Sequence, residues 1–249
     1  MPVSRTELNA YLNELLQVDQ FKDYCPNGLQ VEGSATIERL VTGVTASQGL
    51  IEEAIAHNAQ AILVHHGYFW KGENPCLTGI KRNRIATLLE HDINLFAYHL
   101  PLDAHKSLGN NVQLAHTMGW TVAGNLGDTL ALHGLVDGTE TGGSLAKKLT
   151  ETLGFEVLHI GEELDNIETI AWCTGAAQGY LAEAIEAGVD AFVSGEISEP
   201  TVHLARESGV HYFAAGHHAT ERGGVIALGE HLAQRFDLDV QFIDLPIPV

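Results

Sequence analysis

The sequence predicts an α/β protein made of two related lobes, each built from β-α-β units. Runs rich in β-branched residues alternate with helical segments, the order typical of a parallel sheet with crossover helices. A segment of the first half, Val41–His66, matches a segment of the second half, Ala171–Glu196. The chain length of 249 residues fits one large domain or two small ones.

The first half opens with an amphipathic helix. Ser4 and Glu7 form a capping-box pattern, and apolar residues from Leu8 to Leu16 follow at helical spacing. A turn-rich loop, Asp23–Gly33, comes next. The elements expected after it are a strand at Ile37–Thr45, a helix from Ser47, a strand at Ala61–Val64, a helix around Asn83–His91 and a strand at Asn94–Tyr98.

The second half repeats this order. Val41–His66 aligns with Ala171–Glu196 with seven identical positions, among them the Gln-Gly pairs that begin at Gln48 and Gln178. Two unrelated β-α-β units could converge to this extent. The shared Gln-Gly turn favours an internal duplication instead.

These patterns divide the chain into three parts. We expect a first lobe at residues 1–125, a second lobe at 126–220, and a C-terminal segment at 221–249 that packs back on the first lobe. The boundary is placed near Asn125 because Gly124–Asp128 is rich in turn residues. The C-terminal segment reads as a helix, Glu221–Phe236, and a strand, Asp239–Asp244. A metal site is expected in the cleft between the lobes.

Composition excludes several classes of partner. Thirteen Lys and Arg against 32 Asp and Glu give a net charge of −19, which argues against sequence-specific nucleic-acid binding and against an anionic membrane surface. A small anionic substrate in a local site is still compatible. The three cysteines, Cys25, Cys76 and Cys173, are far apart and form no CxxC, which fits a reducing compartment. With no signal peptide or long apolar run, the expected location is the cytoplasm.

Histidines and carboxylates cluster after three expected strands. Ligands of open α/β sheets lie beyond the carboxyl ends of the strands. His217 and Glu221 are four residues apart where a helix begins, so their side chains share one face. Imidazoles and carboxylates without thiolates suit zinc, iron, manganese or nickel, although a lone histidine at a strand end is more often structural. The three clusters are His65 and His66; His99, Asp103 and His105; and His217, His218 and Glu221.

Other polar and aromatic residues leave alternatives open. Lys81, Arg82 and Arg84 read as a solvated helix start or as an anion clamp. Glu196 is either a supporting site residue or a surface carboxylate, and Gly109-Asn110-Asn111 reads as a turn. At least one residue of Tyr68-Phe69-Trp70 should line the cleft or an interface. Solvated or capping roles are expected for His57, His91, His116, His133, His159 and His231.

Seven motifs carry a family resemblance. In order, PNGLQVEG, TGVTASQ, VHHGYFWKGE, YHLPLDAH, CTGAAQ, DAFVSGE and GHHATERGG resemble the Nif-three-like dinuclear-metal family, whose bacterial members are commonly called GTP cyclohydrolase I type 2 homologues. The resemblance covers essentially the whole chain. It differs at Gly67, where proline is commoner, and at His99-Leu-Pro-Leu-Asp103, where the commoner string is His-Thr-Asn-Leu-Asp.

The resemblance implies a ligand set and an assembly. It implies that two divalent cations are bound, with Glu221 bridging them, His66 and Asp103 completing one ion, and His65 and His217 completing the other. It also implies a toroidal homohexamer whose sites face an internal cavity.

The resulting expectation is a metal-dependent hydrolase that acts on a nucleotide-like substrate. Metal ions would activate water, and His99 would support the ligands or transfer a proton. GTP ring opening is only one candidate, because no guanine-recognition motif or Walker loop is present. The alternative is a non-enzymatic metal-binding ring that carries metal or forms a protein-interaction scaffold.

Overall fold

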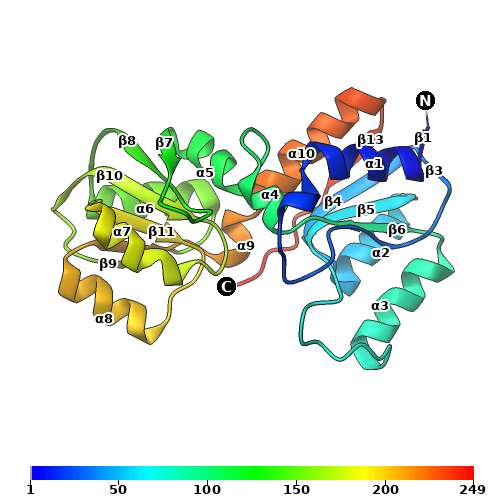
Figure 1. Cartoon of the computed structure of the whole chain (residues 1–249), viewed down its shortest axis with the longest axis horizontal. Helices are drawn as coiled ribbons and strands as arrows, with labels where there is room; N and C mark the ends of the chain where they lie inside the picture. The colour runs from blue at the N-terminus through cyan, green and yellow to red at the C-terminus, as the bar shows by residue number, and fades with distance from the viewer. Residues whose placement is uncertain (1) are drawn as a thin grey trace. The chain divides into compact units, whose positions relative to one another are not determined.

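The computed structural model describes residues 2–249, which form two compact units (Figure 1). Unit 1 comprises the chain up to Gly109 together with Gly224–Leu245, and unit 2 comprises Asn110–Gly223 and Pro246–Val249. Each unit contains its own sheet and its own hydrophobic core. The predicted α/β class is confirmed.

Unit 1 is built on a five-stranded sheet of order β13-β4-β5-β6-β2. Four of these strands are parallel, and β2 runs antiparallel at the edge. A short pair, β1 and β3, lies apart from it. The elements are β1 (Val3–Ser4), α1 (Arg5–Leu15), η1 (Val18–Gln20), β2 (Gly28–Val31), β3 (Thr36–Ile37), β4 (Arg39–Thr45), α2 (Gln48–Ala56), β5 (Ala61–His66), α3 (Gly79–Glu90), β6 (Asn94–Ala97), α4 (Leu100–Ala104), α10 (Arg222–Phe236) and β13 (Asp239–Phe242).

The central strand β5 shows why this sheet is covered on both faces. Ala61 and Leu63 pack in one cluster with residues of α1 and α10. Ile62 and Val64 pack in another cluster with residues of α2 and α3. Because successive side chains of a strand point to opposite faces, an uninterrupted apolar run needs helices on both sides. Figure 1 shows α1 and α10 on one face of this sheet and α2 on the other.

Unit 2 contains a six-stranded sheet of order β7-β8-β10-β11-β12-β9. Its three central strands, β10, β11 and β12, are parallel, and the flanking strands are antiparallel. Helices α5 and α6 pack on one face, and α7 and α8 on the other. The elements are α5 (Asn110–Met118), β7 (Thr121–Asn125), β8 (Leu132–Thr141), α6 (Gly142–Leu153), β9 (Leu158–Ile160), β10 (Asn166–Cys173), η2 (Gln178–Tyr180), α7 (Leu181–Ala187), β11 (Ala191–Ser194), α8 (Glu199–Ser208), β12 (His211–Ala214) and α9 (His217–Thr220).

The two parallel cores have the same register. In unit 1, Leu40 pairs with Ala61 and Gly43 pairs with Val64. In unit 2, the residues aligned with these four by the repeat pair in the same way, Ile170 with Ala191 and Cys173 with Ser194. The internal duplication stays a prediction, and this shared register supports it.

The chain passes between the units earlier than the turn-rich segment near Asn125 suggests. Asn110 and Asn111 do not form a turn, because they begin α5, where both are buried. Leu114 and Met118 of this helix belong to the core of unit 2. Glycine and asparagine favour a turn at this point, but the apolar face of the helix that follows packs in the core and draws Asn110 and Asn111 into its first turn.

No helix within residues 2–249 is both long enough and apolar enough to cross a lipid bilayer.

Candidate metal centre

His65 and His66 are the last two residues of β5, in unit 1. The His65 side chain is fully buried, and its Nδ1 lies 2.9 Å from the carbonyl oxygen of Tyr98. A carbonyl only accepts hydrogen bonds, so Nδ1 of His65 carries the proton and Nε2 keeps its lone pair. His66 is held by Thr45, whose Oγ1 lies 3.1 Å from its Nδ1.

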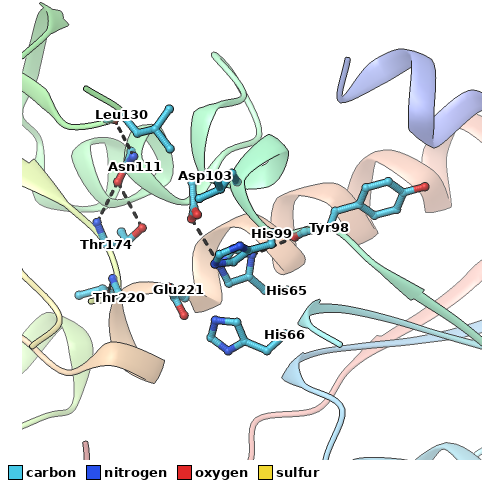
Figure 2. Close-up of polar contacts among 12 residues, drawn as sticks. His65, His66, Tyr98, His99, Asp103, Asn111, Leu130, Thr174, Thr220 and Glu221 are labelled. Atoms are coloured by element: carbon cyan, nitrogen blue, oxygen red, sulfur yellow. Dashed lines mark hydrogen bonds and ion pairs between the residues drawn. The ribbon is translucent and has the colours of Figure 1, made fainter. Parts of the chain in front are cut away.

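Asp103 is supplied by the short helix α4, which begins just after β6. Only 8% of its surface is exposed, and its Oδ1 lies 3.4 Å from Nε2 of His65 (Figure 2). Pro101 lies in the first turn of α4, where its missing N–H costs no hydrogen bond. The family resemblance implies that Asp103 shares an ion with His66, whereas the contact within unit 1 places Asp103 beside His65.

His99 precedes α4 and lies beside the His65–His66 pair. One ligand atom from each of His65, His66 and His99 lies within 4.8 Å of the other two. The ring of Trp70 meets the His99 ring edge-on, with centroids 5.0 Å apart. The sequence allows His99 either a supporting role or a role in proton transfer, and both roles agree with this position.

The Nδ1 of His99 lies 2.7 Å from Oδ1 of Asp23. Burial opposes ionisation of Asp23, but hydrogen bonds from His99, Asn27 and Tyr24 outweigh it and lower the pKa of Asp23 from 3.8 to about 2. Asp23 is therefore ionised and can only accept hydrogen bonds. Cys25 is close to the same pair, but burial first, and then the charge of Asp23, raise the pKa of its thiol to about 12, so it offers no thiolate ligand at neutral pH.

His217 and Glu221 bracket the short helix α9 in unit 2. Their spacing brings His217 Nε2 to 3.2 Å from Glu221 Oε2, which agrees with the shared face expected from the sequence. On its other side, His217 Nδ1 lies 2.7 Å from Oε1 of Glu196. Burial lowers the pKa of His217, but the two glutamates outweigh burial and raise it to about 9. Glu196 is thus a supporting residue of His217 rather than an isolated surface carboxylate.

Glu221 is 3% exposed, and a glycine makes room for it. A Cβ on Gly175 would lie 2.1 Å from Oε1 of Glu221, and the φ of Gly175 is +69°. Any side chain at position 175 would therefore displace the Glu221 carboxylate and strain the backbone. Nothing in the sequence signals this requirement beyond the glycine itself.

Four imidazoles share one arrangement: an oxygen atom holds each Nδ1. The partners are Tyr98 O for His65, Thr45 Oγ1 for His66, Asp23 Oδ1 for His99 and Glu196 Oε1 for His217. Histidines that bind metals through Nε2 are typically fixed in this way by a partner at the other nitrogen. The donor set of imidazoles and carboxylates therefore fits divalent first-row metals.

Residues next to the His65–His66 pair explain one departure from the family pattern. A Cβ on Gly67 would lie 2.2 Å from Oε1 of Gln30, and that oxygen accepts a hydrogen bond from the Tyr68 N–H at 2.6 Å. A proline at position 67 would collide with Gln30. Tyr68 then turns into the core and donates to Ala46 O, whereas Trp70 lies against His66 and His99.

The basic residues of α3 have different surroundings. Lys81 Nζ lies 3.1 Å from Oε2 of Glu73 and 4.8 Å from the centroid of the Phe69 ring, whereas Arg82 is exposed. An anion clamp using all of Lys81, Arg82 and Arg84 would require Lys81 to leave Glu73.

Two histidines expected to be solvated or capping have packing roles instead. His159 stacks on Phe213 with centroids 4.5 Å apart, and its Nε2 lies 3.0 Å from Nδ1 of the buried His211. His231 lies 2.5 Å from the hydroxyl of Tyr11, between α1 and α10. Their partners come from distant parts of the chain, so spacing along the sequence could not reveal them. By contrast, His57 caps its helix as expected.

Comparison with known proteins gives a consistent result. The model of the Duf34/NIF3 (NGG1p interacting factor 3) family matches residues 3–247. Proteins named "GTP cyclohydrolase 1 type 2 homolog" from Yersinia pestis and Escherichia coli K12 are 55% and 51% identical, over 97% and 99% of this chain and 98% and 100% of theirs.

Solved structures agree. A protein described as ybgI, of unknown function, is 51% identical with a TM-score of 0.96, over 99% of this chain and 100% of its own. TTHA1606 from Thermus thermophilus is 33% identical with a TM-score of 0.90, over 99% and 100% of the two chains.

Proposed function

Because the chain belongs to the Duf34/NIF3 family, we propose that it binds two divalent metal ions and hydrolyses a nucleotide-like substrate with their help. The observation that carries this proposal is that an oxygen atom holds Nδ1 of four imidazoles, those of His65, His66, His99 and His217. Metal-binding histidines are typically fixed in this way, through the ring nitrogen that does not face the metal.

We assign five ligands on the basis of the family resemblance and these local contacts. His65, His66 and Asp103 come from unit 1, and His217 and Glu221 come from unit 2. Glu221 would be shared by both ions. Ions held in this way lower the pKa of bound water and polarise the bond that is attacked. Zinc, iron, manganese and nickel all suit the donor set.

The chain's own residues supply the remaining steps. His99 lies beside the His65–His66 pair and can take a proton from the attacking water. Trp70 covers one side of His99 and restricts solvent there. Exposed Arg82 can attract an anionic substrate. The names of the curated relatives make a purine nucleotide the first substrate to test.

The test is a substrate screen on metal-loaded protein with nucleotides, cyclic compounds and phosphoesters. We expect turnover that disappears in His66→Ala and persists in His91→Ala, a matched change at an exposed histidine after α3. Elemental analysis of both variants should show metal loss only in His66→Ala. Absence of turnover with every class, together with rapid metal exchange, would contradict the hydrolase and favour the carrier or scaffold.

Assembly and location stay predictions. The family resemblance predicts a toroidal homohexamer with inward-facing sites. The sequence predicts a cytoplasmic location. Light scattering at micromolar concentration and physiological salt should give a hexamer, and a monomer would contradict it. The double variant Arg82→Glu/Arg84→Glu separates two roles. Loss of assembly assigns these residues to an interface, and an intact ring with weaker nucleotide binding assigns them to substrate attraction.

A further inference from the structure

The loop between η1 and β2 holds His99 at several points. The side-chain oxygen of Asn27 accepts a hydrogen bond from the His99 N–H at 2.7 Å. Oδ2 of Asp23 accepts from the Leu100 N–H at 2.9 Å, at the start of α4. Asn27 also donates to Oδ2 of Asp23 at 2.9 Å, so the two side chains support each other. The loop fixes both the backbone and the ring of His99.

The contact between Asp23 and the His99 ring is buried and strongly directional. Only 3% of the Asp23 side chain and 15% of the His99 side chain are exposed, and Oδ1 and Nδ1 are 2.7 Å apart. A buried carboxylate without such partners would be costly, and here both oxygens are used. Because an ionised carboxylate only accepts, the proton of neutral His99 lies on Nδ1, and the lone pair lies on Nε2.

His99 differs in this respect from the neighbouring His65. A neutral carbonyl fixes His65, whereas a full negative charge fixes His99. A carboxylate behind an imidazole both sets its tautomer and stabilises the imidazolium that forms when Nε2 accepts a proton. A carbonyl sets the tautomer with much less stabilisation of the charge. Of these two histidines, His99 is therefore the better suited to accept a proton.

We propose that Asp23 is the positioning residue of an Asp23–His99 pair, which holds Nε2 of His99 ready to take a proton from the attacking water. This role rests on the proposed hydrolysis. In the step, the proton of the water moves to Nε2, and the O–H electron pair forms the new bond to the substrate. The bond that is cleaved in the substrate gives its electron pair to the leaving atom, which then takes the proton back from Nε2. Asp23 retains its hydrogen bond to the Nδ1 proton throughout. Asn27 orients Asp23 and the His99 backbone.

The experiment compares the wild type with Asp23→Asn, using Asp19→Asn on exposed η1 as the matched control. Histidine-selective ¹³C and ¹⁵N labelling reports the tautomer of His99 without any substrate. We expect the Nδ1–H form in the wild type and in Asp19→Asn. Asp23→Asn should shift it towards the Nε2–H form, because an amide N–H can donate to Nδ1. A wild-type Nε2–H form would overturn the proposal even if Asp23→Asn failed to fold.

Two further readouts complete the test. Metal content should be the same in the wild type, Asp23→Asn and His99→Gln, and metal loss in His99→Gln would make His99 a ligand and overturn the proposal. With a substrate in hand, Asp23→Asn should lower kcat by about 10²–10⁴-fold with little change in KM. The double variant should be no worse than His99→Gln alone. If the wild type turns over nothing, the hydrolase proposal fails, while the tautomer and metal content still decide the positioning pair.

Discussion

In unit 1, β5 runs into His65 and His66, whereas the corresponding strand of unit 2, β11, runs into Gly195 and Glu196. The strand registers are the same, but the space at the strand ends differs. A Cβ on Gly195 would lie 2.7 Å from both Gly175 O and His217 Cα. The backbone fills the position in unit 2 that an imidazole fills in unit 1. Unit 2 therefore presents its candidate ligands from the next strand connection, at α9.

Thr45 and its counterpart in the repeat, Gly175, show the same division. In unit 1, Thr45 holds the ring of His66. In unit 2, Gly175 leaves room for the Glu221 carboxylate. The residue at this position fixes His66 in unit 1, and it leaves space for Glu221 in unit 2.

The opposite end of the parallel core is the same in both units. Gln60 Oε1 accepts hydrogen bonds from Glu38 N and Arg39 N at 3.1 and 2.9 Å. Asp190 aligns with Gln60 in the repeat, and its Oδ2 accepts from Glu168 N and Thr169 N at 3.0 and 2.8 Å. These hydrogen bonds are thus the same at one end of the strands, whereas the candidate functional residues differ at the other end. The end that differs between the units is the one that carries the candidate ligands.

The largest effect is expected from removing Glu221, one of the two candidate ligands that unit 2 supplies. Glu221→Gln should lose most of both metal ions, because two cations would face each other with less compensating charge. Elemental analysis of protein purified without chelator measures this directly. Glu207→Gln, at an exposed site on α8, is the control. Full occupancy in Glu221→Gln would contradict the role of Glu221 as a ligand shared by both ions.

Gly175→Ala tests the space that unit 2 reserves for this carboxylate. We expect a loss of about 2–4 kcal/mol in the free energy of unfolding, since strain at positive φ adds to a steric clash, together with at least about tenfold weaker metal binding. Gly188→Ala has a similar φ of +70° with no neighbour within 4 Å, so it should cost only about 1–2 kcal/mol. Urea unfolding and metal titration distinguish the two. Equal metal affinities in Gly175→Ala and Gly188→Ala would show that metal binding does not need the space beside Gly175.

Thr45→Val tests the matching position in unit 1. The substitution keeps the shape but removes the oxygen that holds His66. Loss of such a supporting hydrogen bond should weaken metal binding by about 10-fold, at the lower end of effects of this kind. Competition with a chelator measures the affinity. Thr87→Val, on α3, removes a hydroxyl that bonds only within its helix and should leave the affinity unchanged.

The smallest effect concerns pH and is confined to unit 2. Burial, and then the neighbouring His211, lower the pKa of His159 from its usual 6.5, with Glu163 opposing them. Because the unfolded state binds the proton more readily, this contribution to stability is complete above about pH 6.5 and is lost as the pH falls towards the folded pKa. Protection of β9 and β12 amides from hydrogen exchange, corrected for intrinsic rates, should decline over this range.

His159→Phe should flatten that decline by keeping the stacking while removing the titrating group. His203→Gln, at an exposed position on α8, should not change it. A decline of the same size in His159→Phe would mean that another group is responsible.

The strands and the candidate ligands could be predicted because their signals are local. Ala61–Val64 is an apolar run, and His65, His66, Asp103, His217 and Glu221 follow strands at expected places. The fold class needs only such patterns. How the two units together use these ligands stays a prediction.

The supporting contacts could not be predicted, because they join residues far apart in the sequence. Asp23 meets His99 across 76 positions, and Tyr98 O meets His65 across 33. One weak signal was present: Asp23 and Asn27 lie four residues apart in a loop rich in turn formers. Asn110 shows the reverse problem, since a residue type common in turns is buried at a helix start.

Unit 1 is discontinuous, and this has a consequence for synthesis. A nascent chain that has emerged as far as Gly223 already contains every strand of unit 2. The core of unit 1 still lacks Val225, Leu228 and Leu232 of α10 at that stage, and its sheet lacks β13. Since domains fold as units while the ribosome extends the chain, the sheet of unit 2 is complete before the sheet of unit 1. The sheet that the chain begins first is thus finished last, and its apolar face lacks α10 until then.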